Sequence, residues 1–297
     1  MLFCDVSKGE VVPYYGVPIE RAASVEYVKK AIALDSSDPV KNLLFFFRYL
    51  DDSDWAVAHD AFAEVSSVDD THIGAAGRKL DAGKIRRWLE DPKTPQVRAG
   101  LYAKLLAAAG KPKDAGILLS ILEDRNRESG TRLDMILVAY TMLAPKDGWA
   151  YTLAILGNPG EDFERRYAAF SALRYHTESR SGVVTNRQIT AVYLLLLGQA
   201  DLADPAIEDL RRSERWDLAD KVLAVEKTKV YDQPIVKRSM LRFALQCKGS
   251  AAAKAFVAAR RKADPEDVAD AQKLLDWETP PAPATADAKK SAESPKK

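Results

Sequence analysis

A leucine followed by a short polar turn recurs four times at nearly constant spacing, and this period limits the folds open to the chain. The leucines are Leu50, Leu89, Leu122 and Leu156, with separations of 39, 33 and 34 residues. Each ends a segment with helical periodicity. The residues that follow, such as Asp91-Pro92 and Asn158-Pro159, are types that cap helices and form tight turns. The pattern therefore predicts repeated pairs of helices.

A second amphipathic helix is predicted after each turn, because apolar residues recur there at i, i+4 and i+7 or i+8. The four stripes are Val57/Ala61/Val65, Val97/Leu101/Leu105, Leu133/Leu137/Tyr140 and Phe163/Tyr167/Phe170. A lone pair of helices cannot cover its own apolar face, so such pairs stack on one another. Units of this length built from two helices are typical of a helical solenoid. A compact helical bundle is the alternative fold.

The segments before the first unit are predicted to be an arm and two helices. Residues 1–18 form an extended or β arm, because polar and apolar residues alternate there before the turn-forming segment Pro13–Gly16. A helix follows, with Val25, Val28, Ala31 and Ile32 at helical spacing. Asp38 and Pro39 provide an N-cap and a first-turn proline, which open the next helix.

Further helices are predicted beyond the four units. The polar segment 176–186 reads as a loop. After it come a helix over 188–197, a pair of helices opened by Asp204-Pro205 and by Trp216-Asp217, a helix over 233–247 that carries Val236, Met240 and Phe243, and helices over 249–262 and 265–277. We expect one helical repeat domain over residues 19–277, with a possible break at 176–186. Residues 278–297 are rich in Pro, Ala and Lys and are predicted to be a disordered tail.

Net charge and hydropathy limit the classes of partner and the localisation expected for the chain. Its 297 residues carry a formal net charge of +1, which gives no bias toward nucleic acid or membrane surfaces. No apolar run approaches the roughly 18 residues of a spanning helix, and the N-terminus lacks the regions of a signal peptide. Cytoplasmic localisation is the default expectation; the alternative is a truncated start, with export possible. Cys4 follows a weak lipoprotein-like sequence without its apolar segment, and with Cys247 it makes no disulfide framework.

The repeat pattern resembles that of the HEAT-repeat, armadillo-like α-solenoid family in its bacterial form. The residues that carry the resemblance are the segments at 88–106, 49–65 and 155–173, of which the first fits the family pattern most fully. The resemblance implies stacked antiparallel hairpins that bind other macromolecules and carry no chemistry of their own. It also implies a charged residue early in each second helix that contacts the turn of the next unit, at about Asp60, Arg98, Asp134 and Arg166.

Residues with catalytic or metal-binding patterns are scarce. The three histidines, His59, His72 and His176, do not combine with acidic residues at metal-ligand spacing, and no Cys-x-x-Cys is present. The sequence also lacks a nucleophile elbow, a phosphate-binding glycine loop and a dinucleotide motif. We therefore predict no catalytic, cofactor-binding or metal site and no cofactor.

Aromatic and basic residues are interpreted as structural. Trp88, Trp149, Trp55 and Trp216 are assigned to the core or to packing between repeats, because aromatic side chains carry large burial energies. The Arg and Lys clusters lie beside acidic residues, as on solvated helix faces with ion pairs.

The sequence predicts a non-enzymatic scaffold that binds a protein partner of unknown identity through the concave face of the solenoid. Binding to a membrane is not expected, binding to nucleic acid is disfavoured, and the oligomeric state is left open. Two alternatives use the same frame. One is an enzyme or enzyme subunit, which requires a pocket where a carboxylate such as Asp60 or Asp134 has a perturbed pKa. The other is a nucleic-acid-binding protein with a continuous basic stripe.

Overall fold

A computed structural model describes residues 2–16, 21–127, 132–179 and 182–278. Helices account for 74% of the chain, which places the protein in the mainly-α class, as the sequence predicted. The described residues contain sixteen α-helices and one two-stranded sheet. The predicted tail at 278–297 lies outside the described residues except for Glu278, which ends the last helix.

The N-terminal arm is a β-hairpin, in agreement with the prediction of a short β element. The turn expected at Pro13–Gly16 is wrong, because these residues lie in the second strand. Strand β1 (Leu2–Ser7) pairs antiparallel with β2 (Glu10–Gly16), and Ser7 is opposite Glu10. Lys8 and Gly9 between them both have positive φ, 53° and 83°. This is the two-residue turn whose twist matches that of the paired strands.

The chain divides into two compact units. Unit 1 comprises Met1–Ile155 and Glu161–Val184, and unit 2 comprises Leu156–Gly160 and Thr185–Lys297. The helices of unit 1 are α1 (Ala22–Ile32), α2 (Pro39–Phe47), α3 (Trp55–Ser66), α4 (Asp70–Ala76), α5 (Ala82–Glu90), α6 (Gln96–Ala109), α7 (Ala115–Glu123), α8 (Leu133–Leu143), α9 (Pro145–Leu156) and α10 (Phe163–Ser179). Leu156, the last residue of α9, is assigned to unit 2.

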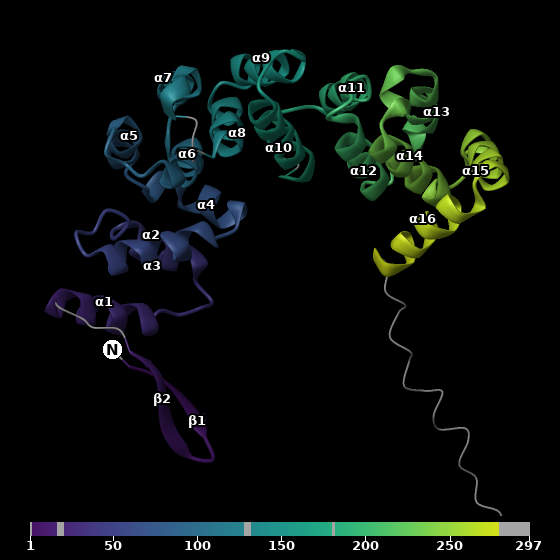
Figure 1. The fold of residues 1–297 in the computed structure, drawn as a ribbon. Helices are drawn as coiled ribbons and strands as arrows, with labels where there is room; N and C mark the ends of the chain where they lie inside the picture. The colour runs from purple at the N-terminus through teal and green to yellow at the C-terminus, as the bar shows by residue number, and fades with distance from the viewer. Residues whose placement is uncertain (1, 17–20, 128–131, 180–181, 279–297) are drawn as a thin grey trace, which may run out of the picture. The chain divides into compact units, whose positions relative to one another are not determined.

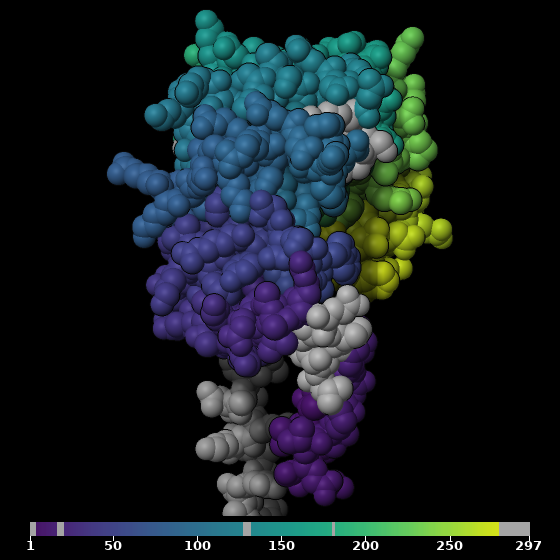
Figure 2. All heavy atoms as spheres, turned by 90° about the vertical axis from the view of Figure 1, so that its left-hand side faces the viewer, coloured from purple at the N-terminus to yellow at the C-terminus, as the bar shows by residue number. Residues whose placement is uncertain are grey.

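Helices of unit 1 pack in the order of the sequence. Helix α4 contacts α6, α6 contacts α8, and α8 contacts α10, so these helices form one row, with α5 and α7 in a second row (Figure 1). The colour gradient accordingly runs in one direction from α2 to α8 in the space-filling view (Figure 2). Each of the pairs α5/α6 and α7/α8 is in contact across its turn. The predicted sequential packing of helical pairs is thus present in this unit.

Local residues explain where several helices begin. The Asp38 side chain accepts a hydrogen bond from the Lys41 backbone amide at 3.0 Å, and Pro39 occupies the first turn. This is the predicted start of α2. Thr185 and Gln188 form a reciprocal capping box at the start of α11 (Asn186–Leu196). In each case a side chain satisfies an amide that has no partner within the helix.

The backbone oxygens of the period leucines accept hydrogen bonds from side chains far along the chain. The Leu50 oxygen accepts from Arg98, the Leu122 oxygen accepts from Arg165 at 2.8 Å, and the Leu156 oxygen accepts from Gln199 at 2.7 Å. These carbonyls lie at or beyond helix ends, where intrahelical partners are missing. At these three positions, a donor from a later helical pair therefore completes the end of an earlier one.

Gly148 and Gly100 are two of the positions at which close helix packing requires glycine. A Cβ atom on Gly148 would lie 2.5 Å from the Thr141 backbone nitrogen, and one on Gly100 would lie 2.6 Å from the Arg132 Cβ atom. Real Cβ atoms do not approach that closely. Gly148 thus lets α9 pass directly over α8, and Gly100 lets α6 approach Arg132 at the start of α8.

Unit 2 contains α11, α12 (Ala203–Arg212), α13 (Ala219–Leu223), α14 (Pro234–Gln246), α15 (Ala251–Ala263) and α16 (Pro265–Glu278). Arg211, buried on α12, donates to Glu208 at 2.8 Å, to Gln246 of α14 at 2.6 Å and to Glu278 of α16 at 2.7 Å. One guanidinium therefore joins three helices of this unit. Because a buried Arg needs its donors satisfied, the cluster fixes their mutual register.

Several predicted stripes have the correct residues on the buried face and others do not. Val57, Ala61, Val65, Leu133, Leu137, Tyr140, Val236, Met240 and Phe243 are buried as predicted. The predicted burial of Val97 is wrong, because its side chain is 60% exposed. Helix α6 contacts α4, α5 and α8 and is apolar nearly all round, so the stripe did not identify its buried face. Phe163 and Tyr167 are also exposed, at 51% and 40%, because Arg165 and Arg166 occupy the buried face of α10.

Boundaries and one helix differ from the sequence prediction. Helix α4 was not expected; it accounts for the longer first separation, and its glycine-containing sequence hides the helical period. Helix α10 continues through His176 to Ser179, so the predicted loop starts later. Helix α12 begins at Ala203 rather than at Asp204-Pro205, because proline is accommodated within a first turn.

Candidate functional site

Helix α1 is held against α2 and α3 by one buried aromatic residue and two polar contacts. Tyr27 is 3% exposed, and its ring packs against those of Phe45 and Tyr49. Its hydroxyl donates to Asp60 on α3 at 2.6 Å, and Ser24 donates to Asp54 at the start of α3. Burial, together with the Asp60 hydrogen bond, raises the pKa of the Tyr27 hydroxyl well above its usual value. The hydroxyl is therefore a donor that ties α1 to α3.

The apolar stripe expected on α1 is not buried. Ile32 is 81% exposed and Val25 is 37% exposed, while Val28 and Ala31 are half-buried. The reason is that α1 contacts its neighbours through Ser24 and Tyr27 instead. Val28, Ala31 and Ile32 of this stripe consequently line an open groove.

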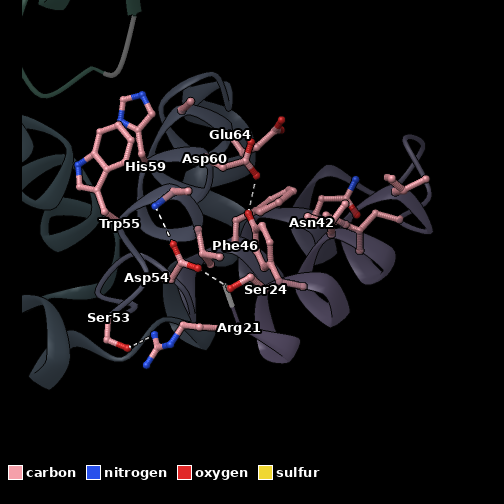
Figure 3. A pocket seen from close by; sticks show the side chains of 18 of the residues that line it. Arg21, Ser24, Asn42, Phe46, Ser53, Asp54, Trp55, His59, Asp60 and Glu64 are labelled. Carbon is pink, nitrogen blue, oxygen red and sulfur yellow. Dashed lines mark hydrogen bonds between the residues drawn. The ribbon is translucent and has the colours of Figure 1, made fainter. Parts of the chain in front are cut away.

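The opposite wall of the groove is the exposed face of α3. Trp55 is 73% exposed and stacks on His59, with ring centroids 4.9 Å apart and planes inclined by 9°. Asp60 and Glu64 follow on the same helix and are also exposed. This wall thus offers an aromatic pair at one end and carboxylates farther along (Figure 3).

The groove between α1 and α3 has a volume of about 1040 Å³. Phe46, Val57 and Tyr27 contribute to its lining. Arg21 donates to Ser53 at 2.7 Å (Figure 3). The ionisable lining residues are Arg21, Asp54, His59, Asp60 and Glu64. Three carboxylates against one guanidinium make the groove acidic, with apolar side chains on both walls.

The hydrogen bonds of Asp54 are internal. Its carboxylate accepts from Ser24 and from the Ala56 backbone amide at 3.0 Å, and the Ser24 hydrogen bond in particular lowers its pKa below the ordinary value. Among the groove carboxylates, Asp54 is therefore a helix cap, Asp60 accepts from Tyr27, and Glu64 lies exposed farthest along α3.

The four residues that the resemblance placed near turns have different roles. Arg98 does contact a turn, but that of the preceding unit: it donates to the Leu50 oxygen and to the Ala58 oxygen at 3.1 Å. Asp134 accepts from Arg132 at 2.8 Å, and Arg166 is buried on α10. At α10 the contact to the earlier turn is made by Arg165, one residue before the position expected.

Asp60 and Asp134, the carboxylates named for the enzyme alternative, each accept a hydrogen bond from a neighbouring side chain. Asp60 lines the groove, whereas Asp134 does not. The Asp60 contact joins α1 to α3, the Asp134 contact is local to the start of α8, and neither favours that alternative. The absence of enzymatic activity stays a prediction.

Histidines and cysteines are not brought together. His59 is exposed in the groove, whereas His176 is 3% exposed beside Trp149. Neither nitrogen of His176 has a hydrogen-bond partner among the residues that the structure describes. Cys4 is exposed and Cys247 is buried, and burial raises the pKa of the Cys247 thiol. Within the residues that the structure describes, no three His, Cys, Asp or Glu side chains are arranged to hold a metal ion.

The tryptophans divide between packing and exposure. Trp88 and Trp149 are buried, as expected, and Trp88 donates to Asp51 at 3.2 Å and stacks on Tyr102. The packing role predicted for Trp55 is wrong, because it lies beyond Asp54, the N-cap of α3, on the exposed face. Sequence spacing did not reveal the groove, since its two helical walls are separated in the sequence by α2.

Comparison with known proteins found no matching family model, no matching curated protein and no matching solved structure. Among the described residues, no helix has both the length and the apolar character that crossing a membrane requires.

Proposed function

We propose that the chain is a HEAT-like helical-repeat scaffold that binds a partner protein through the α1–α3 groove. The occupant is an amphipathic helical segment of the partner, with an apolar stripe flanked by Lys or Arg. The single observation that carries the proposal is the uncovered apolar stripe of α1, which faces a second helix wall bearing carboxylates.

Three features support the solenoid part of the proposal. Helical pairs recur every 33–39 residues, each packs on the next in sequence, and the leucine oxygens accept side-chain donors from later pairs. The end of a helical stack needs a different surface wherever no further pair covers it. Among the described residues, the face of α1 that carries the exposed Ile32 borders the groove.

The dimensions and chemistry of the groove fit a helix. Two roughly parallel helical walls with apolar residues form the kind of groove in which partner helices lay an apolar face. Val28 and Ile32 on α1 and Ala63 on α3 offer apolar contact, and Glu64 offers an unneutralised carboxylate at the rim. Rim charges set partner choice and association rate more than affinity, so a basic segment is selected over an acidic one.

The test uses two labelled synthetic peptides of about four helical turns. Both carry the same leucine stripe; the polar face has Lys in one and Glu in the other. Fluorescence anisotropy is expected to show that the Lys peptide binds and the Glu peptide binds at least about tenfold more weakly. Glu64→Lys should reverse this preference, and Ile32→Asp should weaken binding of both peptides.

Val97→Asp is the matched control, because Val97 is an exposed valine on α6, outside the groove. Its affinity for the Lys peptide should equal that of the unmodified chain. The proposal is wrong if neither peptide binds, or if Val97→Asp weakens binding as much as Ile32→Asp does. Circular dichroism of each variant checks that the helices are retained.

A further inference from the structure

The N-terminal hairpin is largely exposed. Cys4–Ser7 of β1 and all of β2 are exposed, including Val6 (75%), Val11 (67%) and Tyr14 (65%). A two-stranded hairpin is marginally stable by itself in water, and it gains stability when the sheet acquires more strands. An exposed strand edge offers unpaired N–H and C=O groups for that extension.

The register shows which edge is open. Ser7 and Glu10 close the two-residue turn as a hydrogen-bonded pair, so by alternation Val6/Val11 and Cys4/Pro13 are non-hydrogen-bonded pairs. Backbone groups in such pairs point away from the partner strand. On β2 this places Pro13, which has no N–H, at the outer edge and blocks pairing there. On β1 the same alternation directs the backbone N–H and C=O groups of Cys4 and Val6 outward.

Pairing of β1 with a second β1 has one favoured register. The outward residues of β1 are Leu2, Cys4 and Val6, since the irregularity in the ladder leaves Tyr14 of β2 as the extra residue. When Cys4 of one copy lies opposite Cys4 of the other, Leu2 of each copy pairs with Val6 of the other. All outward backbone N–H and C=O groups of Leu2, Cys4 and Val6 then have partners. Asp5 then lies opposite Phe3. Shifting the register toward the turn would instead bring two Asp5 carboxylates together, which is unfavourable.

We propose that β1 mediates self-association, in which two copies of the chain join their hairpins into a four-stranded antiparallel sheet with the order β2-β1-β1-β2. The occupant of the open edge is a second copy, because β1 is self-complementary in the register centred on Cys4. The interface is isologous, as two-fold symmetry requires. Strand β1 contributes no residue to the lining of the α1–α3 groove, to which the hairpin supplies only Tyr15 of β2.

The test measures oligomeric state by sedimentation equilibrium on the full chain under reducing conditions. The unmodified chain should show a concentration-dependent dimer. Val6→Pro removes an outward N–H from β1 without removing a bond of the hairpin itself, and it should weaken the dimer at least about tenfold. Val11→Pro makes the same change at the outer edge of β2, which Pro13 already blocks, and should leave the dimer unchanged.

The free thiol of Cys4 reports the register. Opposed residues in a hydrogen-bonded pair have Cα atoms about 5.5 Å apart, within the range of a disulfide. Diamide oxidation of the native protein should therefore cross-link the dimer, and Cys4→Ser should abolish the cross-link while retaining the dimer. A monomeric unmodified chain, a dimer insensitive to Val6→Pro, or equal loss of the dimer in Val11→Pro would each overturn the proposal.

Discussion

His176 links the stability of the protein to pH. The imidazole of His176 on α10 lies buried beside Trp149 of α9. Burial lowers its pKa to about 4 from the ordinary value of 6.5. Between these two values the unfolded chain binds a proton that the folded chain excludes. Stability therefore rises with pH across this window, and it is lost as pH falls below about 6.5.

The magnitude follows from the two pKa values. The full difference corresponds to about 3 kcal/mol, and the part lost between pH 7 and pH 5 is about 2 kcal/mol. This is a sizeable share of the 5–15 kcal/mol typical of a folded domain. Carboxylates add their own pH dependence, so the effect of His176 must be isolated as a difference between two chains.

The assay is urea unfolding followed by circular dichroism at pH 7, 6 and 5, for the unmodified chain and for His176→Phe. Phenylalanine keeps a ring against Trp149 and binds no proton. When the pH falls from 7 to 5, the free energy of unfolding of the variant should rise by about 2 kcal/mol relative to that of the unmodified chain. His59→Phe is the control, because His59 is exposed in the folded protein as well. Parallel pH profiles for the unmodified chain and His176→Phe would refute the reasoning.

Two further changes test how the helices are joined. Arg98→Met should lower the free energy of unfolding by about 3 kcal/mol, because the backbone oxygens of Leu50 and Ala58 lose a charged donor. Urea unfolding measures this free energy. The control is Lys30→Met, at an exposed position on α1, which should change the free energy of unfolding little. Gly148→Ala should lower it by about 1–3 kcal/mol, because the added Cβ meets the Thr141 backbone. Gly116→Ala, on α7 with open space around it, should be neutral or slightly stabilising in the same thermal or urea assay; equal losses in both glycine variants would contradict the role given to Gly148.

The pairing of helices could be predicted from the sequence because burial imposes a strict spacing. Leu50, Leu89 and Leu122 are fully or nearly fully buried, and such positions tolerate little besides large apolar residues. Turn chemistry between them is local, as Asp38 and Pro39 illustrate. Signals of this kind lie within a few residues of one another and are readable without coordinates.

Other features depend on contacts between distant residues. The face of α6 could not be assigned because the helix is covered on several sides, so Val97 and Leu101 look equivalent in sequence. The groove could not be predicted without knowing that α1 contacts α3 through Ser24 and Tyr27 and leaves Ile32 exposed. Arg98 was singled out by its position in the repeat, but the direction of its contact follows only from the three-dimensional packing.

The hydroxyl of Tyr175 on α10 donates to Asp70 on α4, and Lys104 of α6 pairs with the same carboxylate. In a purely linear array, each repeat contacts only its neighbours, and the ends can fray independently of the middle. Here one carboxylate closes a loop of 105 residues. Fraying of α10 must break a bond held at the other end of the row, so unit 1 should lose its structure in one cooperative step rather than repeat by repeat.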